Sequence, residues 1–224
     1  MNNNIRIVSF NCKNVKTSVS CIKNLCNSHD VILLQETWLY KQELSFLNTI
    51  DYKFYAKGFS TIDYSKGPLV GRPYGGIAIL WRKTLGKKCL ITGVDDRIMA
   101  ISLPLSNNEN ILLYNVYLPY QCRDNYGEFM EYIGKINMLV QSADTPYVLV
   151  MGDFNADLSN INDNSNNGVH FGKELRDFCH NEGLILSDYV KLGNNNDTHT
   201  FISSAHSSVS WLDHCISTTN GHLY

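Results

Sequence analysis

The feature that most constrains this chain is a short apolar run that ends in polar residues. Tyr147–Met151 is apolar and partly β-branched, which is the pattern of a fully buried strand, and Gly152 is expected to end it. Asp153 and Asn155 follow at once, with side chains on the same side if the chain stays extended. Such a strand end can hold reactive groups at a sheet edge. Taken alone, Asp-x-Asn fits an ordinary turn equally well, because both residue types favour turns.

A second predicted strand also ends in polar residues, and the rest of the sequence predicts several more short strands. Val31–Leu34 is a second apolar run, and it leads directly into Gln35 and Glu36. Helical spacing predicts helices near residues 18–28, 40–49, 126–143 and 172–181. Strand patterns fall at residues 5–10, 52–56, 77–81, 89–92, 97–103, 110–118, 184–188, 198–202 and 210–217. This succession favours an α+β fold in which two sheets pack face to face with helices outside, as one domain.

Composition excludes several classes of protein. No apolar run approaches the roughly 18 residues that a membrane span needs, and the Asn-rich start has no signal-peptide core. The seven cysteines are odd in number and scattered, which favours reduced thiols over a zinc site or a complete disulfide framework. We therefore expect an intracellular protein.

Charge is divided unevenly along the chain. Residues 1–100 hold 14 Lys and Arg against 7 Asp and Glu, whereas residues 101–224 hold 5 against 14. A basic flank could face phosphates while an acidic centre holds a cation, or the charge could simply solvate the surface.

Several polar residues share a placement in or at the end of predicted apolar strands. Each one could be a cap, a turn residue or a buried hydrogen-bonded group, but a buried carboxylate is costly unless it is paired or bound to metal. Together they suit phosphodiester hydrolysis with a hard cation such as Mg²⁺, which prefers oxygen ligands. They are Asn11, Glu36, Asn115, Tyr117, Asp153, Asn155 and Asp213.

Five motifs occur in the order seen in the endonuclease/exonuclease/phosphatase superfamily. They are Ser9-Phe10-Asn11, Gln35-Glu36-Thr37, Asn115-Val116-Tyr117-Leu118-Pro119, Gly152-Asp153-Phe154-Asn155 and Trp211-Leu212-Asp213-His214. The Gln-Glu-Thr-Trp form and Arg72-Pro73-Tyr74-Gly75-Gly76 most resemble the endonuclease domain of non-LTR retrotransposons. The resemblance covers nearly the whole chain. It implies a DNase I-like four-layer α/β sandwich with two mainly antiparallel sheets, and a Mg²⁺-dependent DNA endonuclease.

The resemblance also implies catalytic roles. Glu36 would be the principal Mg²⁺ ligand with Asn11 beside it, and Mn²⁺ is the alternative cation. Asp153 would orient or deprotonate the attacking water, Asn155 would contact the phosphate, and Tyr117 would stabilise the transition state or the leaving oxygen.

Further roles concern DNA and a histidine. Asn115, Thr200 and Ser210 match positions that bind or approach DNA, and Asp213 would orient a histidine that binds the scissile phosphate. Relatives carry that histidine in a terminal Ser-Asp-His motif, which residues 1–224 do not contain. His214 is expected to point to the opposite face of its strand from Asp213.

We therefore expect a single domain that lacks its last strand and the Ser-Asp-His motif, with weak or no activity. A form extended past Tyr224 is expected to be active.

The resemblance implies nicking of target DNA to leave a 3′-hydroxyl for reverse transcription. The implied partners are DNA and the reverse transcriptase domain of the same polyprotein, and we expect a monomer that acts in the nucleus. One alternative is a non-catalytic remnant that only binds nucleic acid. Another is a phosphodiesterase of the same fold that acts on abasic DNA, RNA or a phosphorylated small molecule or lipid.

Overall fold

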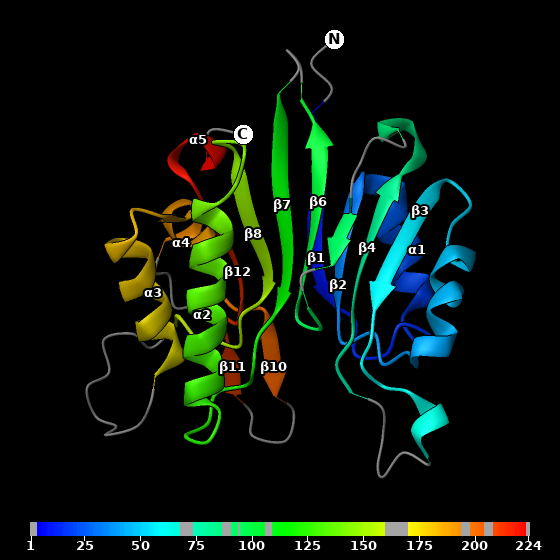
Figure 1. The fold of residues 1–224 in the computed structure, drawn as a ribbon, viewed down its shortest axis with the longest axis horizontal. Helices are drawn as coiled ribbons and strands as arrows, with labels where there is room; N and C mark the ends of the chain where they lie inside the picture. The colour runs from blue at the N-terminus through cyan, green and yellow to red at the C-terminus, as the bar shows by residue number, and fades with distance from the viewer. Residues whose placement is uncertain are drawn as a thin grey trace. The chain divides into compact units, whose positions relative to one another are not determined.

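The chain forms two large sheets and several helices, which confirms the predicted mixed α/β class (Figure 1). The structure is a computed structural model that describes residues 4–67, 74–86, 91–93, 95–105, 109–159, 170–193, 198–203 and 208–222. It divides into two compact units, unit 1 (Met1–Tyr117) and unit 2 (Leu118–Tyr224). The expectation of a single domain over residues 1–224 stays a prediction.

Unit 1 contains one α-helix, three short 3-10 helices and seven strands among its described residues. In chain order they are β1 (Ile7–Asn11), α1 (Val19–Ser28), β2 (Val31–Gln35), η1 (Lys41–Thr49), β3 (Phe54–Phe59), η2 (Tyr64–Lys66), β4 (Ile77–Arg82), η3 (Lys83–Leu85), β5 (Ile91–Gly93), β6 (Ile98–Pro104) and β7 (Asn110–Tyr117).

Two sheets pack against each other inside unit 1. The first has the order β1-β2-β4-β3, in which β1 and β2 are parallel and the other pairs are antiparallel. The second is formed in this unit by the antiparallel strands β5, β6 and β7. Figure 1 shows α1 on one side of the first sheet and β6 and β7 on the other. All five residues of β2 are buried, as expected for a strand that is covered on both faces.

A buried amide contact joins these two sheets. Gln35 Nε2 donates to Asn115 Oδ1 at 2.6 Å, and Asn115 Nδ2 donates to the carbonyl oxygens of Leu34 at 3.1 Å and Ala78 at 2.9 Å. Both side chains are 0% exposed. Gln35 also donates to the Ser9 hydroxyl at 3.0 Å. Asn115 is thus buried between the sheets in a structural contact, and its predicted DNA contact stays a prediction.

Unit 2 contains four α-helices and five strands among its described residues. In chain order they are α2 (Tyr126–Gln141), β8 (Val148–Asp153), α3 (Phe171–Asn181), β9 (Ile185–Leu186), α4 (Ser187–Leu192), β10 (Phe201–Ser203), β11 (Ser208–Ser210), β12 (Asp213–Ser217) and α5 (Thr219–His222). Strand β12 lies between β8 and β9 and is antiparallel to both, and β10 and β11 form a separate hairpin.

Helices α2 and α3 pack side by side in unit 2 (Figure 1). The rings of Phe129 and Phe171 stack at the contact, with centroids 4.0 Å apart. The amphipathic stripe predicted for α2 is confirmed, because Phe129, Ile133, Ile136 and Val140 are all buried.

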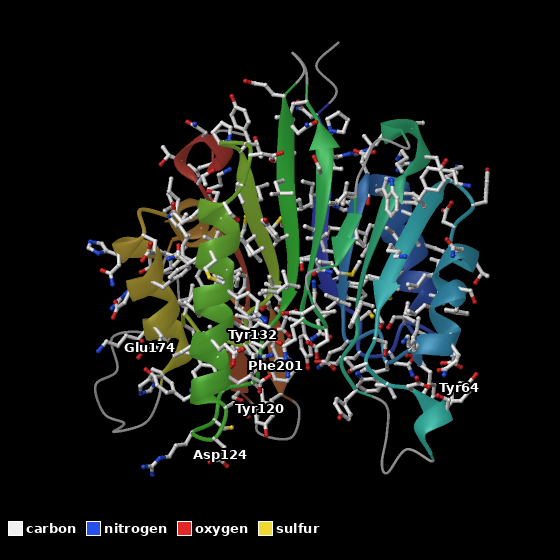
Figure 2. All side chains as sticks on the ribbon, viewed as in Figure 1. Tyr64, Tyr120, Asp124, Tyr132, Glu174 and Phe201 are labelled. Carbon is white, nitrogen blue, oxygen red and sulfur yellow. The ribbon has the colours of Figure 1, made fainter. Side chains whose placement is uncertain are left out.

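Some expected elements differ in their ends. Gly152 does not end β8, which continues to Asp153. The strand expected at residues 184–188 is only two residues long, because Ser187 already begins α4. The strand expected to begin near residue 198 begins at Phe201, whose side chain is labelled in Figure 2. Parts of the expected strand 89–92 and of the polar loop 158–168 lie outside the described residues.

Replacing Gly172 by Ala is predicted to lower the free energy of unfolding by about 3 kcal/mol or more. A Cβ atom there would lie 2.0 Å from the carbonyl oxygen of Asp157, and backbone cannot yield easily. Gly134→Ala is the matched control on α2, where a Cβ meets nothing within 4 Å. It should stabilise the chain by about 0.5–1 kcal/mol. Urea unfolding measures both, and equal effects would contradict the packing described here.

Asn115→Ala is predicted to cost about 2–4 kcal/mol of unfolding free energy, because it leaves buried partners of the amide without hydrogen bonds. Asn110→Ala, at the exposed start of the same strand, should change stability by less than about 0.5 kcal/mol. Urea unfolding of both variants provides the comparison. A neutral Asn115→Ala would show that the amide contact does not hold the sheets.

Candidate functional site

The parallel pairing of β1 and β2 places the predicted metal ligands together in unit 1. Asn11 lies opposite Gln35 in the register, so Asn11 and Glu36 emerge at the same edge of the sheet. Asn11 Nδ2 donates to Glu36 Oε1 at 2.8 Å, and Trp38 Nε1 donates to Glu36 Oε2 at 3.2 Å. Both carboxylate oxygens of Glu36 are thus held by neutral N–H groups. We call Asn11, Glu36 and Trp38 the Glu36 cluster.

The backbone of this cluster is unusual. Glu36 and Trp38 have φ angles of +53° and +55°, a left-handed conformation that non-glycine residues seldom adopt. The carbonyl oxygens of Gly76 and Gly75 accept the N–H groups of Thr37 and Trp38 at 3.1 and 3.0 Å. These bonds hold the left-handed conformation. Strain of this kind is concentrated at functional sites in proteins.

The donor set of the Glu36 cluster suits a hard divalent cation. Mg²⁺ is typically bound by one or two carboxylates together with water and substrate phosphate. Among the described residues there is no group of three or more His, Cys, Asp or Glu side chains that could hold a metal. Asn11 acts here as an orienting donor, because its Oδ1 accepts from the Lys13 amide at 3.2 Å. To offer Oδ1 to a cation beside Glu36, the amide would have to rotate.

Tyr117 is held at the end of β7 by Arg97. Their backbones are joined by the bond from Tyr117 N to Arg97 O at 2.9 Å. The guanidinium donates to Tyr117 O at 3.2 Å and lies 5.4 Å from the centre of the tyrosine ring. Nothing in the sequence pattern pointed to Arg97.

The predicted carboxylates of unit 2 lie side by side. Asp153 of β8 is directly opposite Asp213 of β12, so both side chains stand on one face of the sheet. Like charges in this position oppose folding. Asp153 is 4% exposed, and its Oδ1 accepts a hydrogen bond from the backbone N–H of Asn155 at 2.9 Å. We call Asp153, Asn155 and Asp213 the Asp153 cluster.

Asn155 has a left-handed backbone with φ +50°. Its side-chain amide donates to Leu118 O at 2.9 Å, and Leu118 N donates to Asp153 O at 2.9 Å. The bond from the Asn155 backbone N–H to Asp153 Oδ1 is the local hydrogen bond expected of Asp in a turn, and it also fixes the Asp153 carboxylate. A turn and a site residue are not exclusive here.

The residues expected near DNA in unit 2 have structural contacts. Thr200 Oγ1 accepts the N–H groups of Leu212 and Asp213 at 3.0 and 3.1 Å, so it holds the start of β12. Ser210 pairs with Phe201 in the hairpin. Thr200 is exposed and Ser210 partly exposed, and their contact with DNA stays a prediction.

His214 lies on the opposite side of β12 from Asp213, as predicted. It is 3% exposed, its Nδ1 is 2.9 Å from Asp188 Oδ2, and its Nε2 is 2.7 Å from Ala156 O. Its ring also packs near Phe154 and Trp211. These contacts give His214 a structural role in unit 2.

Basic residues lie at and after the end of strand β4, and the first of them has a structural role. Arg82 Nε binds Asp30 Oδ1 at 2.9 Å, and Arg82 Nη2 donates to the carbonyl oxygens of Cys26 and His29 near the end of α1. Arg82 is therefore committed to the fold. Lys87, Lys88, Arg72 and Pro73 lie outside the described residues.

Two remaining expectations concern thiols and membranes. All described cysteines are unpaired thiols, and burial raises the pKa of Cys12, beside the Glu36 cluster, to about 12. At neutral pH this thiol is protonated and unreactive. In the part of the chain that the structure describes, every helix is too short or too polar to cross a bilayer.

Solved structures share this fold at low sequence identity. The 3′ phosphatase NExo of Neisseria, bound to a product DNA hairpin, is 14% identical with a TM-score of 0.73, covering 98% of this chain and 89% of that one. The AP endonuclease LMAP of Leishmania major is 13% identical with a TM-score of 0.75, covering 98% and 80%. The endonuclease domain of TRAS1, a telomere-specific non-LTR retrotransposon, is 15% identical with a TM-score of 0.61, covering 96% and 85%.

No curated protein sequence matches the chain. A model of the Endonuclease/Exonuclease/phosphatase family, however, matches residues 8–223, which span both clusters and all five motifs. The structural neighbours carry the same DNase I-like architecture. The chain belongs to the Endonuclease/Exonuclease/phosphatase family.

Proposed function

We propose that this protein is a divalent-cation-dependent endonuclease that nicks DNA, with Glu36 as the cation ligand and Asp153 as the group that activates water. The single observation that carries the proposal is the Glu36 carboxylate, held at both oxygens in a left-handed segment of a chain that belongs to this family. Such a carboxylate is preorganised for one geometry. When bound, Mg²⁺ would polarise a phosphoryl oxygen and offset charge on the leaving oxygen.

The roles of the other residues follow from their surroundings. Asp153 is buried, and the backbone N–H of Asn155 orients its carboxylate. This arrangement suits a group that accepts a proton from water. Asp213 stands beside Asp153 across the sheet. Tyr117, held by Arg97, would contact the leaving oxygen.

DNA is the proposed substrate class. Unit 1 carries 14 Lys and Arg against 8 Asp and Glu, whereas unit 2 carries 5 against 13, so the positive charge is concentrated in the unit that holds the Glu36 cluster. One structural neighbour was solved with a DNA hairpin product, and another is a retrotransposon endonuclease. We further propose that the nick supplies a 3′-hydroxyl for the reverse transcriptase of the same polyprotein, inside the nucleus.

Nicking of supercoiled plasmid is predicted to require Mg²⁺ and to stop in EDTA. The nicking rate of Asp153→Asn should be at least about 100-fold below that of the parent chain. This is the usual loss when a catalytic proton acceptor is removed. Glu36→Gln should lower the nicking rate comparably, and excess Mg²⁺ should restore part of the loss. Gel assays of open-circle product measure each rate.

Two isosteric controls separate catalysis from charge. Glu109→Gln in unit 1 and Asp144→Asn in unit 2 each change one exposed acidic residue, and both should cleave within about twofold of the parent rate. Thermal unfolding must show that all variants fold. Metal-independent cleavage, or unchanged cleavage by Asp153→Asn, would refute the assigned roles.

The substrate itself is tested by running duplexes with an abasic site or a 3′-phosphate, and a single-stranded RNA, beside the plasmid. Selective hydrolysis of one of these would transfer the proposal to a same-fold phosphodiesterase. Folded protein that binds DNA but cleaves none of the four substrates would support a non-catalytic remnant.

A further inference from the structure

We infer that Trp38 is a positioning residue that fixes the orientation of the Glu36 carboxylate for the cation. This inference rests on the proposed function, because it concerns the same cation ligand. It assigns a chemical task to a side chain that no strand or core pattern singled out. The evidence lies entirely within unit 1.

The geometry around Glu36 defines the task. Trp38 Nε1 donates to Oε2 from the segment after β2, and Asn11 Nδ2 donates to Oε1 from the last residue of β1. A carboxylate offers about four lone-pair sites, so two donors fix its plane and leave acceptor capacity for a cation. With Trp38 replaced by a side chain without N–H, the carboxylate would keep only the Asn11 bond among these two. Its plane could then rotate, and the cation would have to restrict that rotation on binding.

The indole is brought to Glu36 by the backbone. Glu36 and Trp38 are both left-handed, and the Gly75 and Gly76 carbonyl oxygens hold the two N–H groups that follow Glu36. Gly76 must lack a side chain, because a Cβ atom there would lie 2.5 Å from Thr37 Oγ1. The glycine segment therefore sets the position of the Trp38 ring. A residue that merely filled space would not need this support.

The charge of the donor also matters. A lysine or arginine at position 38 could bind Glu36 more strongly, but its positive charge would compete with the cation for the same carboxylate. An indole N–H is a donor without net charge and cannot act as an acceptor. It therefore orients the carboxylate and preserves its negative charge for the metal.

Direct cation binding, without DNA, tests the inference. Mn²⁺ serves as the probe, and electron paramagnetic resonance of free Mn²⁺ gives the dissociation constant. Trp38→Phe, which keeps an aromatic ring and removes the N–H, should weaken Mn²⁺ binding about tenfold, the range for a hydrogen bond to a charged group. Trp38→His, measured at a pH well above the pKa of its imidazole, restores a neutral N–H donor and should bind within about threefold of the parent chain at the same pH.

Trp81→Phe is the matched control, because the indole N–H of Trp81 has no hydrogen-bond partner in the structure. It should leave the Mn²⁺ dissociation constant unchanged. Equal binding by folded Trp38→Phe and the parent chain would overturn the inference, as would a loss in Trp38→His as large as that in Trp38→Phe. Glu36→Gln tests the proposed function separately. If Glu36→Gln binds Mn²⁺ normally, the assignment of the cation to Glu36 fails.

A spectroscopic measurement tests the inference without any substitution of Trp38. Mg²⁺ should change the tryptophan fluorescence of the parent chain and of Trp81→Phe, because the cation and the Trp38 indole share one carboxylate. The change should be absent from Glu36→Gln. A folded parent chain that binds Mg²⁺ at Glu36 without any change in fluorescence would contradict the inference.

Discussion

The buried amide contact between Gln35 and Asn115 is the constraint on which unit 1 depends. Both side chains are fully buried, so each donor or acceptor left without a partner would cost free energy. A slip of β2 by one residue would turn Gln35 to the other face of its strand and break the contact. Since β2 ends at Gln35, the contact also fixes the point at which Glu36 leaves the sheet. A structural amide thereby sets the position of the candidate cation ligand.

Left-handed backbone recurs at residues to which we assign function. Glu36, Trp38 and Asn155 all adopt it, at a cost of roughly 1–2 kcal/mol each for a residue with a side chain. A hydrogen bond involves each of them: Glu36 O accepts the Asn14 N–H, Trp38 N donates to Gly75 O, and Asn155 N donates to Asp153 Oδ1. Sequences usually agree with their folds at every level except at functional sites. Lys13 and Asn14 also have positive φ angles, and they follow shortly after Asn11 of the Glu36 cluster in the chain.

Periodicity predicted most of the elements, and its failures have physical causes. Helix α2 and the strands that end near Glu36 and Asp153 carry long or uniform apolar patterns. Helices α4 and α5 span six and four residues, too few for a 3.6-residue period to appear. Ser18 directly precedes α1, as expected of an N-cap, yet its hydroxyl donates to Cys12 O and does not cap the helix. A pattern locates an element but does not determine which partner a polar side chain selects.

Because a sequence pattern does not determine the partners of a polar side chain, it also does not determine the role of His214. In the sequence, His214 beside Asp213 resembles an Asp-His pair, and only the alternation of a strand argues against it. His214 Nε2 lies within hydrogen-bond distance of Ala156 O, and Nδ1 lies within hydrogen-bond distance of Asp188 Oδ2. Both ring nitrogens are therefore occupied inside unit 2. An imidazole bound in this way cannot bind a phosphate, so the neighbour of Asp213 in sequence cannot be the histidine that Asp213 would orient.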